Sequence, residues 1–313
     1  MGGSRVSGMI SVAAVSVVIP VYNRPVELAY ALNSLVAEAH LIHEVLVIDD
    51  ASASPVIPEI PDELKGKVRV ARLERNLGSS GARQAGIDMA SGEFIAFLDS
   101  DDAWLPGKLA AQLPLFEEND TMLAVATGWQ VVDLDRSLMS TRFPIGADRP
   151  LLFASGCWFC PGSTVILRRA AFDRVGPFDR GLRRLEDLDW FMRFALAGGR
   201  LAVAPVVGAL IRRAAKSNRV IVGEAAERIT AHFDPLLVAR QRERRALLAW
   251  LDVERAFANW TQGRRLSALG LMLRSQLRYP RLGIQLRHWW RIEPPILGRG
   301  EADRLLGTSG HPG

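Results

Sequence analysis

Four short apolar runs near the start of the chain constrain the fold more than any other feature of the sequence. They occupy residues 15–20, 44–48, 68–73 and 93–98, and Arg69 and Arg72 interrupt the third. A short, continuous apolar run such as 15–20 is typical of a strand buried on both faces of a parallel sheet. A helix is predicted after the first run, with Asn23 as its N-cap, and a second helix over 78–89. This alternation predicts an α/β fold, with a doubly wound, mostly parallel sheet flanked by helices.

The middle of the chain has a mixed pattern. It predicts a helix over 106–116, an edge strand over 123–132, a strand over 162–167, and a helix over 187–196 that ends at Gly198.

Beyond Lys216 we find no strand pattern. Apolar residues recur there at helical spacing, first at 250, 253, 257 and 260 and then, after a break at 261–263, at 266, 269, 273 and 277. We therefore expect a lead-in over 1–14, a main α/β domain over 15–216, a basic helical appendage over 217–293, and a flexible tail over 294–313.

Charge is distributed unevenly along the 313 residues. Residues 1–210 carry 20 Lys and Arg against 25 Asp and Glu, whereas residues 211–299 carry 18 against 7. The basic C-terminal third could attract nucleic acid, anionic lipid or an acidic substrate. Its arginines alternate with Leu and Trp at helical spacing, which favours an amphipathic helix at a membrane surface, or one packed on the main domain, over nucleic-acid binding.

Three carboxylates follow the last of the four runs within four positions. Asp99, Asp101 and Asp102 come at the carboxyl end of the predicted strand, which is the edge of an open α/β sheet where ligands bind. Like charges at this spacing repel one another unless a cation or solvent compensates them. A hard divalent ion with oxygen ligands would do so. The alternative interpretation is a solvated acidic loop.

Asp50 ends the second run and belongs to the same predicted sheet edge. Taken alone, it is better explained as a turn or N-cap residue, but a second acidic strand end at the same edge weakens that explanation. Residues 75–83 combine the backbone amides of a helix start with Arg75 and Arg83, a combination that suits a phosphate group. The segment departs from the dinucleotide-binding fingerprint, because no G-x-G-x-x-G follows the first strand.

Three acids, Glu186, Asp187 and Asp189, open the later helix. Acids in a first turn favour the helix dipole, which explains them without a function. A carboxylate that reaches a substrate hydroxyl would instead act as a general base. Cys157 and Cys160 make a single C-x-x-C pair, which is too few ligands for a zinc site, and we interpret them as free thiols. Two cysteines in all fit a reducing cytosol.

Together, these segments resemble the family 2 glycosyltransferases of the inverting GT-A class, over about residues 15–210. The matching motifs are Val-Val-Ile-Pro-Val-Tyr-Asn at 17–23, Val-Ile-Asp-Asp-Ala-Ser at 47–52, Asn-Leu-Gly with Gly-Ala-Arg within 76–83, Phe-Leu-Asp-Ser-Asp-Asp at 97–102, and Glu-Asp at 186–187. Five motifs in this order are far more specific than any one of them. The resemblance implies metal-dependent, inverting transfer of one sugar from a nucleoside-diphosphate sugar, a UDP-sugar, to a hydroxyl acceptor. It also implies a place in bacterial cell-surface glycan or glycolipid synthesis.

The resemblance further implies a role for each matching residue on the donor side. Pro20, Tyr22 and Asp50 would line the base pocket of the nucleotide-sugar, with Asp50 accepting from the base. Arg83 would lie near the nucleotide and its diphosphate.

The resemblance assigns the metal and the base in the same way. Asp99, Asp101 and Asp102 would bind the ribose and Mg²⁺ or Mn²⁺, with Asp101 and Asp102 nearest the metal. Asp187 would be the catalytic base, with Glu186 beside it. The segments 162–164 and 175–179 resemble the family's acceptor-side segments.

The partners expected from this resemblance are a nucleotide-sugar donor and a glycan, glycolipid or protein acceptor. Peripheral contact of the basic C-terminal helices with the inner face of a membrane would accompany a cytoplasmic location. The motif Gln-x-x-Arg-Trp of processive relatives is missing, so we expect a single transfer. The competing hypothesis is a catalytically inactive nucleotide-sugar-binding or regulatory module with a transferase fold.

Overall fold

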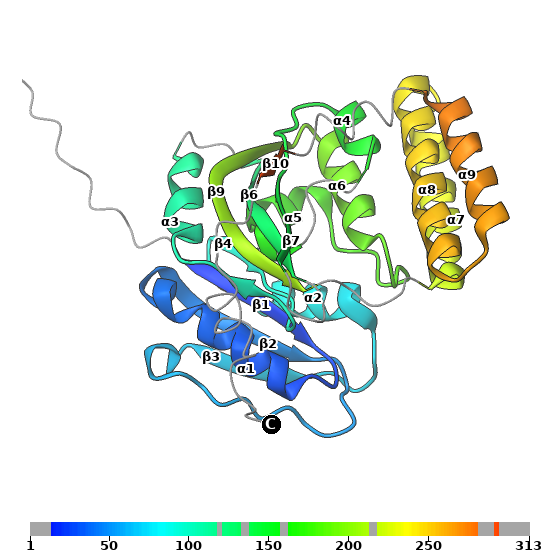
Figure 1. Ribbon diagram of the computed structural model, residues 1–313. Helices are drawn as coiled ribbons and strands as arrows, with labels where there is room; N and C mark the ends of the chain where they lie inside the picture. The colour runs from blue at the N-terminus through cyan, green and yellow to red at the C-terminus, as the bar shows by residue number, and fades with distance from the viewer. Residues whose placement is uncertain are drawn as a thin grey trace, which may run out of the picture.

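The computed structural model describes residues 14–117, 121–132, 138–156, 162–212, 218–280 and 291–293. Its centre is a mixed sheet with helices on both faces (Figure 1). The N-terminal half of the sheet is parallel, in the order β4-β1-β2-β3. Its strands are β1 (Val15–Val21), β2 (Ile42–Asp49), β3 (Val68–Arg72) and β4 (Phe94–Phe97). These are the four apolar runs of the sequence, which confirms the predicted α/β fold.

The other half of the sheet is built around the long strand β6 (Leu123–Val132). One side of β6 pairs with β9 (Arg200–Arg212) in parallel, and the other side pairs with β8 (Ile166–Arg168) and then with β7 (Leu138–Phe143). The prediction that 123–132 forms an edge strand was therefore wrong. The strand β8 is antiparallel to β4 and joins the two halves. The short strand β5 (Ala103–Trp104) pairs with β9.

Two further strand predictions need correction. The strand expected over 162–167 starts only at Ile166, because Gly162–Thr164 forms a 3-10 turn. The strand β10 (Arg291–Glu293) pairs with β7, although no strand was expected beyond Lys216.

Alternate side chains of the parallel strands enter two different cores, because successive residues of a strand face opposite sides of the sheet. Val17 and Ile19 pack on the same side as Leu28 and Leu32 of α1 (Pro25–Ser34). Val18 packs on the other side with α2 (Gly78–Met89) and α6 (Glu186–Leu196). Three short helices complete the main part of the fold: α3 (Lys108–Gln112), α4 (Pro150–Ala154) and α5 (Ala170–Val175). The remaining helical segments are 3-10 turns at Val36–Leu41, Asp62–Leu64 and Leu113–Phe116.

The C-terminal third forms the helices α7 (Arg219–Leu236), α8 (Gln241–Thr261) and α9 (Arg265–Arg278). The predicted break at 261–263 separates α8 from α9. Phe233 of α7 and Trp250 of α8 belong to the same hydrophobic core as Trp190 of α6. Figure 1 shows the three helices together beyond α6, with α9 (orange) at the outer edge of the molecule.

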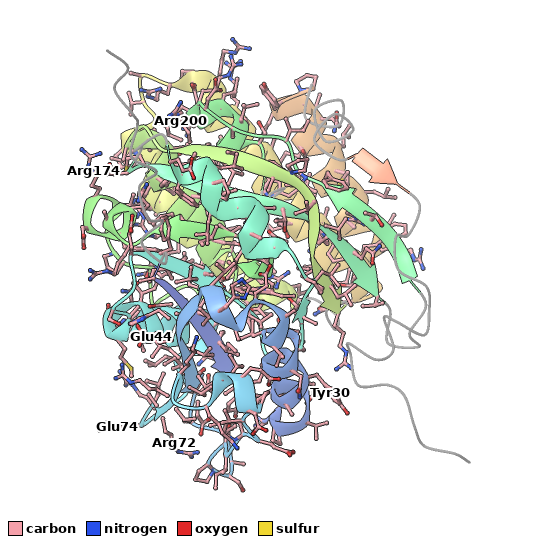
Figure 2. The ribbon with its side chains drawn as sticks, turned by 90° about the vertical axis from the view of Figure 1, so that its left-hand side faces the viewer. Tyr30, Glu44, Arg72, Glu74, Arg174 and Arg200 are labelled. Carbon is pink, nitrogen blue, oxygen red and sulfur yellow. The ribbon has the colours of Figure 1, made fainter. Side chains whose placement is uncertain are left out.

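The strands β1, β2 and β4 run in the same direction, so their carboxyl ends lie at the end of the sheet opposite the start of β2. Figure 2 labels Glu44 near the start of β2 and Arg200 at the start of β9, two strands that run in the same direction. The loops that follow β1, β2 and β4 lie at the other end. Across the described ranges, no helix has the length and apolar character needed to cross a membrane.

Candidate functional site

A cavity of about 730 Å³ opens at the carboxyl ends of β1, β2 and β4, which is where open α/β sheets bind ligands. Its volume is in the range of small-molecule sites. The structure brings all nine predicted site residues to its wall: Pro20, Tyr22, Asp50, Arg83, Asp99, Asp101, Asp102, Glu186 and Asp187.

The acidic turn after β4 is held by donors from four different segments. Asp99 Oδ1 accepts from Arg83 Nη2 at 2.6 Å, and Asp101 Oδ2 lies 2.6 Å from Arg24 Nη1. Asp102 is buried, and its Oδ2 accepts from Ser163 Oγ at 2.6 Å while its Oδ1 accepts from the Arg212 backbone N–H at 3.0 Å.

Burial raises the pKa of Asp101 and of Asp102, and repulsion from the neighbouring carboxylates raises both further. The rise is larger for Asp102. The turn therefore holds more negative charge than its surroundings favour, which is the condition that a bound cation relieves.

Arg83 links the acidic turn to the start of α6. Its guanidinium donates from Nη2 to Asp99 and from Nη1 to Glu186 Oε1, both at 2.6 Å. Burial lowers the pKa of Arg83, but the two carboxylates outweigh burial, so that the pKa rises and the charge is retained. Ser79 Oγ also donates to Glu186 Oε1, at 2.8 Å. Glu186 is thus fixed by two donors from α2, and both it and its neighbour Asp187 line the cavity.

Asp50 binds the start of α2. The Leu77 N–H donates to its Oδ1 at 2.7 Å, and the Gly78 N–H donates to its Oδ2 at 2.8 Å. Gly78 has a φ of +74°, a backbone conformation that favours glycine. Burial raises the pKa of Asp50 despite these two bonds. The amides that we predicted to face a phosphate group thus face a carboxylate of the protein, and the exposed Arg75 is not part of the cavity wall.

Three non-glycine residues have left-handed backbone conformations in the described part of the chain, and all three occur in loops at the cavity. They are Asn23 after β1, Ala51 after β2 and Leu185 before α6, with φ values of 54°, 58° and 62°. Strained backbone of this kind concentrates at functional sites. Asn23 is not the N-cap of α1 as predicted, because Arg24 takes that position. Instead, Asn23 Oδ1 accepts from the Ala53 N–H at 2.8 Å and ties the first loop to the second.

The cavity also contains residues that sequence motifs did not single out. Arg24, Arg183, Arg212 and Glu254 line it. Glu254 comes from α8, and in the described part of the chain it has no hydrogen-bond donor. Burial raises the pKa of Glu254 to about 7, with Arg184 lowering it and Asp187 raising it. No sequence signal marked Glu254, because it stands in the middle of a helix far along the chain from the other site residues.

Two predicted acceptor-side segments have different surroundings. Ser163, in the 3-10 turn Gly162–Thr164, contacts the acidic turn, where its Oγ also accepts from the Asp99 N–H at 3.1 Å. Asp179 instead pairs with Arg228 of α7 and is not part of the cavity wall. Cys157 and Cys160 lie outside the described residues.

Within the described ranges, no group of three or more His, Cys, Asp or Glu side chains is arranged to hold a metal ion. This does not conflict with the acidic turn, because Mg²⁺ in transferase sites is usually held by one or two carboxylates together with substrate phosphates. Asp101 and Asp102 stand side by side in the acidic turn, and both line the cavity.

The family model described as glycosyl transferase family 2 matches residues 16–176, about half of the chain. The chain belongs to glycosyl transferase family 2. Across 62% of its length it is 33% identical to the succinoglycan biosynthesis protein ExoO of Rhizobium meliloti, of which it covers 59%. It is 29% identical to the succinoglycan biosynthesis protein ExoW of the same organism, over 91% of this chain and 96% of ExoW.

The chain spans only part of several relatives. An uncharacterized glycosyltransferase of Nostoc sp. is 32% identical over 53% of this chain, which covers 54% of the Nostoc protein. Among solved structures, the S. aureus TarS fragment 1–349 in complex with UDP aligns with a TM-score of 0.54 over 86% of this chain and 91% of that fragment, at 20% identity. That likeness supports the fold of this family 2 member.

Proposed function

We propose that this family 2 protein transfers one sugar from a nucleoside-diphosphate sugar to a hydroxyl group of an acceptor, with inversion at the anomeric carbon. The observation that carries this proposal is the meeting of Asp50, Arg83, the acidic turn and Asp187 in one cavity. Those groups match the chemical demands of the reaction. It needs a site for the nucleotide, groups that offset the negative charge on the leaving diphosphate, and a proton acceptor.

The donor would bind along the loops after β1 and β2. Pro20, Tyr22 and Asp50 are placed to contact the base, and Asp50 would use its remaining lone pairs because both of its oxygens already accept from α2. TarS has been solved with UDP and with UDP-GlcNAc, and a UDP-sugar is the donor that we propose here. Arg83 would face the diphosphate, with Arg24 as a second guanidinium at the same wall.

Mg²⁺ or Mn²⁺ is the cofactor that we propose, held by Asp101 and Asp102 together with the diphosphate, while Asp99 contacts the ribose. Bound there, the ion would offset the negative charge that develops on the leaving group. The chain's own contribution is to hold the three carboxylates in a fixed turn through Arg24, Arg83 and Ser163.

Asp187 would accept the proton of the attacking acceptor hydroxyl. It stands in the first turn of α6, and Arg83 fixes the adjacent Glu186. A hydroxyl that attacks from the side of Asp187, opposite the diphosphate, inverts the anomeric centre. Glu254 is a further carboxyl group near Asp187, and we propose that it contacts the acceptor.

The names of ExoO and ExoW place those relatives in succinoglycan biosynthesis. By analogy, we propose a role in bacterial cell-surface polysaccharide synthesis, with a glycan, glycolipid or protein as acceptor. We further propose a cytoplasmic protein that contacts the inner face of the membrane peripherally, since residues 211–299 carry a net positive charge, with 18 Lys and Arg against 7 Asp and Glu.

A thermal-shift screen with UDP, GDP and dTDP, each with and without Mn²⁺, tests the donor site. We expect UDP with Mn²⁺ to raise the melting temperature most, because a ligand that binds only the native state stabilises it. Release of UDP from a UDP-sugar, followed in the same samples, separates an active enzyme from an inactive binding module. A shift without UDP release would favour the inactive module, and no shift with any nucleotide would contradict the proposal.

A further inference from the structure

The helix α9 is packed with its small residues inward and its large apolar residues outward. Ala268 and Ser275 are its buried residues, and Ser275 Oγ donates to the Ala249 carbonyl oxygen of α8 at 2.8 Å. Four leucines point away from α8 and form what we call the leucine face: Leu266, Leu269, Leu273 and Leu277, which are 86%, 57%, 63% and 75% exposed. At about 100° per residue, the leucine face spans about 80° of the helix surface, opposite Ala268 and Ser275.

The orientation of α9 is fixed by charge as well as by packing. Asp252 of α8 is buried, and it accepts from Arg274 Nε at 3.0 Å and from Arg278 Nη1 at 2.8 Å. These bonds hold α9 on α8 with its leucines outward. Trp260 is half-exposed at the end of α8, and the guanidinium of Arg265 lies 4.5 Å from its ring. The apolar surface thus has arginines at its margin.

The charges along α9 and the end of α8 have one sign. From Arg255 to Tyr279 the sequence contains five arginines and no Asp or Glu. A symmetric dimer through this face would bring two copies of the same basic surface together, because a two-fold interface pairs a patch with itself. An anionic bilayer instead provides both an apolar interior for leucines and negative headgroups for arginines.

We propose that the leucine face of α9 inserts into the headgroup boundary of an anionic membrane, with α9 lying in the membrane plane. The leucines then occupy the acyl side, and the exposed Arg264 and Arg265 contact lipid phosphates, while Arg274 and Arg278 stay paired with Asp252. Figure 1 places α9 at the outer edge of the molecule, with α8 between it and α6, so that the helix can reach a flat surface. This inference rests on the peripheral membrane contact proposed above, which it assigns to α9, and it does not depend on the proposed sugar transfer.

Flotation of the full-length protein tests the proposal, with vesicles of phosphatidylcholine alone and of equal parts phosphatidylcholine and phosphatidylglycerol. We expect the protein to float with the anionic vesicles and to be released as salt is raised. The double variant L266Q/L273Q should lose at least about tenfold in bound fraction, since buried apolar area sets much of the binding strength. A matched control is I57Q/V70Q, which removes two exposed apolar side chains from the other end of the fold and should float like the wild type.

Each remaining outcome contradicts the proposal. Failure of the wild type to float with anionic vesicles would do so, as would undiminished flotation of L266Q/L273Q. A dimer in light scattering that L266Q/L273Q dissociates, without vesicle binding by the wild type, would show that a second copy covers the leucine face. Because the substituted leucines are exposed, the variants should keep the wild-type melting temperature. Nucleotide binding is measured on the same samples. Failure of the membrane proposal can then be distinguished from failure of the proposed sugar transfer.

Discussion

Single residues in the cavity show how a crowded acidic site is tolerated. Asp99 and Asp101 each face an arginine, whereas Asp102 is buried against a hydroxyl and a backbone amide. A buried carboxylate without opposite charge favours its protonated form. The raised pKa of Asp102 is the consequence, and a ligand that brings positive charge would reverse it.

The variant Asp101→Asn tests whether this single carboxylate contributes to metal binding. We expect the wild type to bind UDP at least about tenfold more tightly with Mn²⁺ than without, and D101N to lose most of that difference because the amide is a weaker ligand. Calorimetric titration with UDP in both conditions measures it. Asp62→Asn, at an exposed carboxylate outside the cavity, is the control and should behave as the wild type. Equal Mn²⁺ dependence in D101N and wild type would remove Asp101 from the metal site.

The carboxyl group of Glu254 gives a prediction for pH. Its pKa is about 7 in the native state against 4.5 for the free group, so that the native state binds an extra proton between those values. The contribution of this group to the free energy of unfolding is therefore complete below pH 4.5. It is lost as the pH rises through 7, and the free energy of unfolding falls by up to about 3 kcal/mol. Glu254→Gln cannot ionise, so its melting temperature should fall less than that of the wild type between pH 5 and pH 8. Parallel falls would contradict the assignment.

Residue-level prediction from the sequence succeeded where a residue type stands directly after a strand. Asp50 and Asp99 were placed at one sheet edge from their positions alone, and both line the cavity. Arg212 and Glu254 were missed, because the first acts through its backbone amide and the second through the packing of α8. Neither contribution depends on a local pattern, so the tertiary fold was needed to find them.

Among the elements, α2 does most to position the site, since it carries Arg83 and its first amides bind Asp50. The sequence predicted its range, 78–89, because glycines open it and an apolar face follows. The strand over 123–132 was also found, but its place in the sheet was not. Its main partner, β9, begins at Arg200, and pairing at that distance along the chain leaves no local signal.

Close packing of α2 on β1 gives a prediction for Gly86. A Cβ at this position would lie 2.3 Å from Val18 Cγ1, so that α2 must move away from the sheet. We expect Gly86→Ala to destabilise the protein by about 1–3 kcal/mol, as overpacking does, and to weaken UDP binding through Arg83. Denaturant unfolding measures the first effect. Gly223→Ala in α7 is the control, because its Cβ meets no atom within 4 Å. Equal stability of the two variants would contradict close packing at Gly86.

At the scale of the whole molecule, the C-terminal helices share a core with the sheet. Phe233 and Trp250 pack in one cluster with Trp190 and with Val18 of β1. The sequence separated these helices as an appendage on charge and periodicity, and neither property reports which apolar surfaces meet. Trp250 was predicted to lie on one helix face with Phe257 and Trp260, yet it is buried while they are exposed.

A shared core predicts cooperative unfolding. Tryptophan fluorescence, to which Trp190 and Trp250 contribute, and far-ultraviolet circular dichroism should give coincident transitions in denaturant. Two separate transitions would show that residues 217–293 fold as an independent unit.

The central claim is that Asp187 accepts a proton during sugar transfer from a nucleotide-sugar bound in the cavity. The most direct test compares UDP release from a UDP-sugar by the wild type and by Asp187→Asn, together with UDP affinity. We predict a loss of at least about 100-fold in rate, the usual effect of removing a general base, with UDP affinity within about threefold. Asp173→Asn, an exposed first-turn aspartate of α5, should keep full activity. Unchanged turnover in D187N would contradict the account.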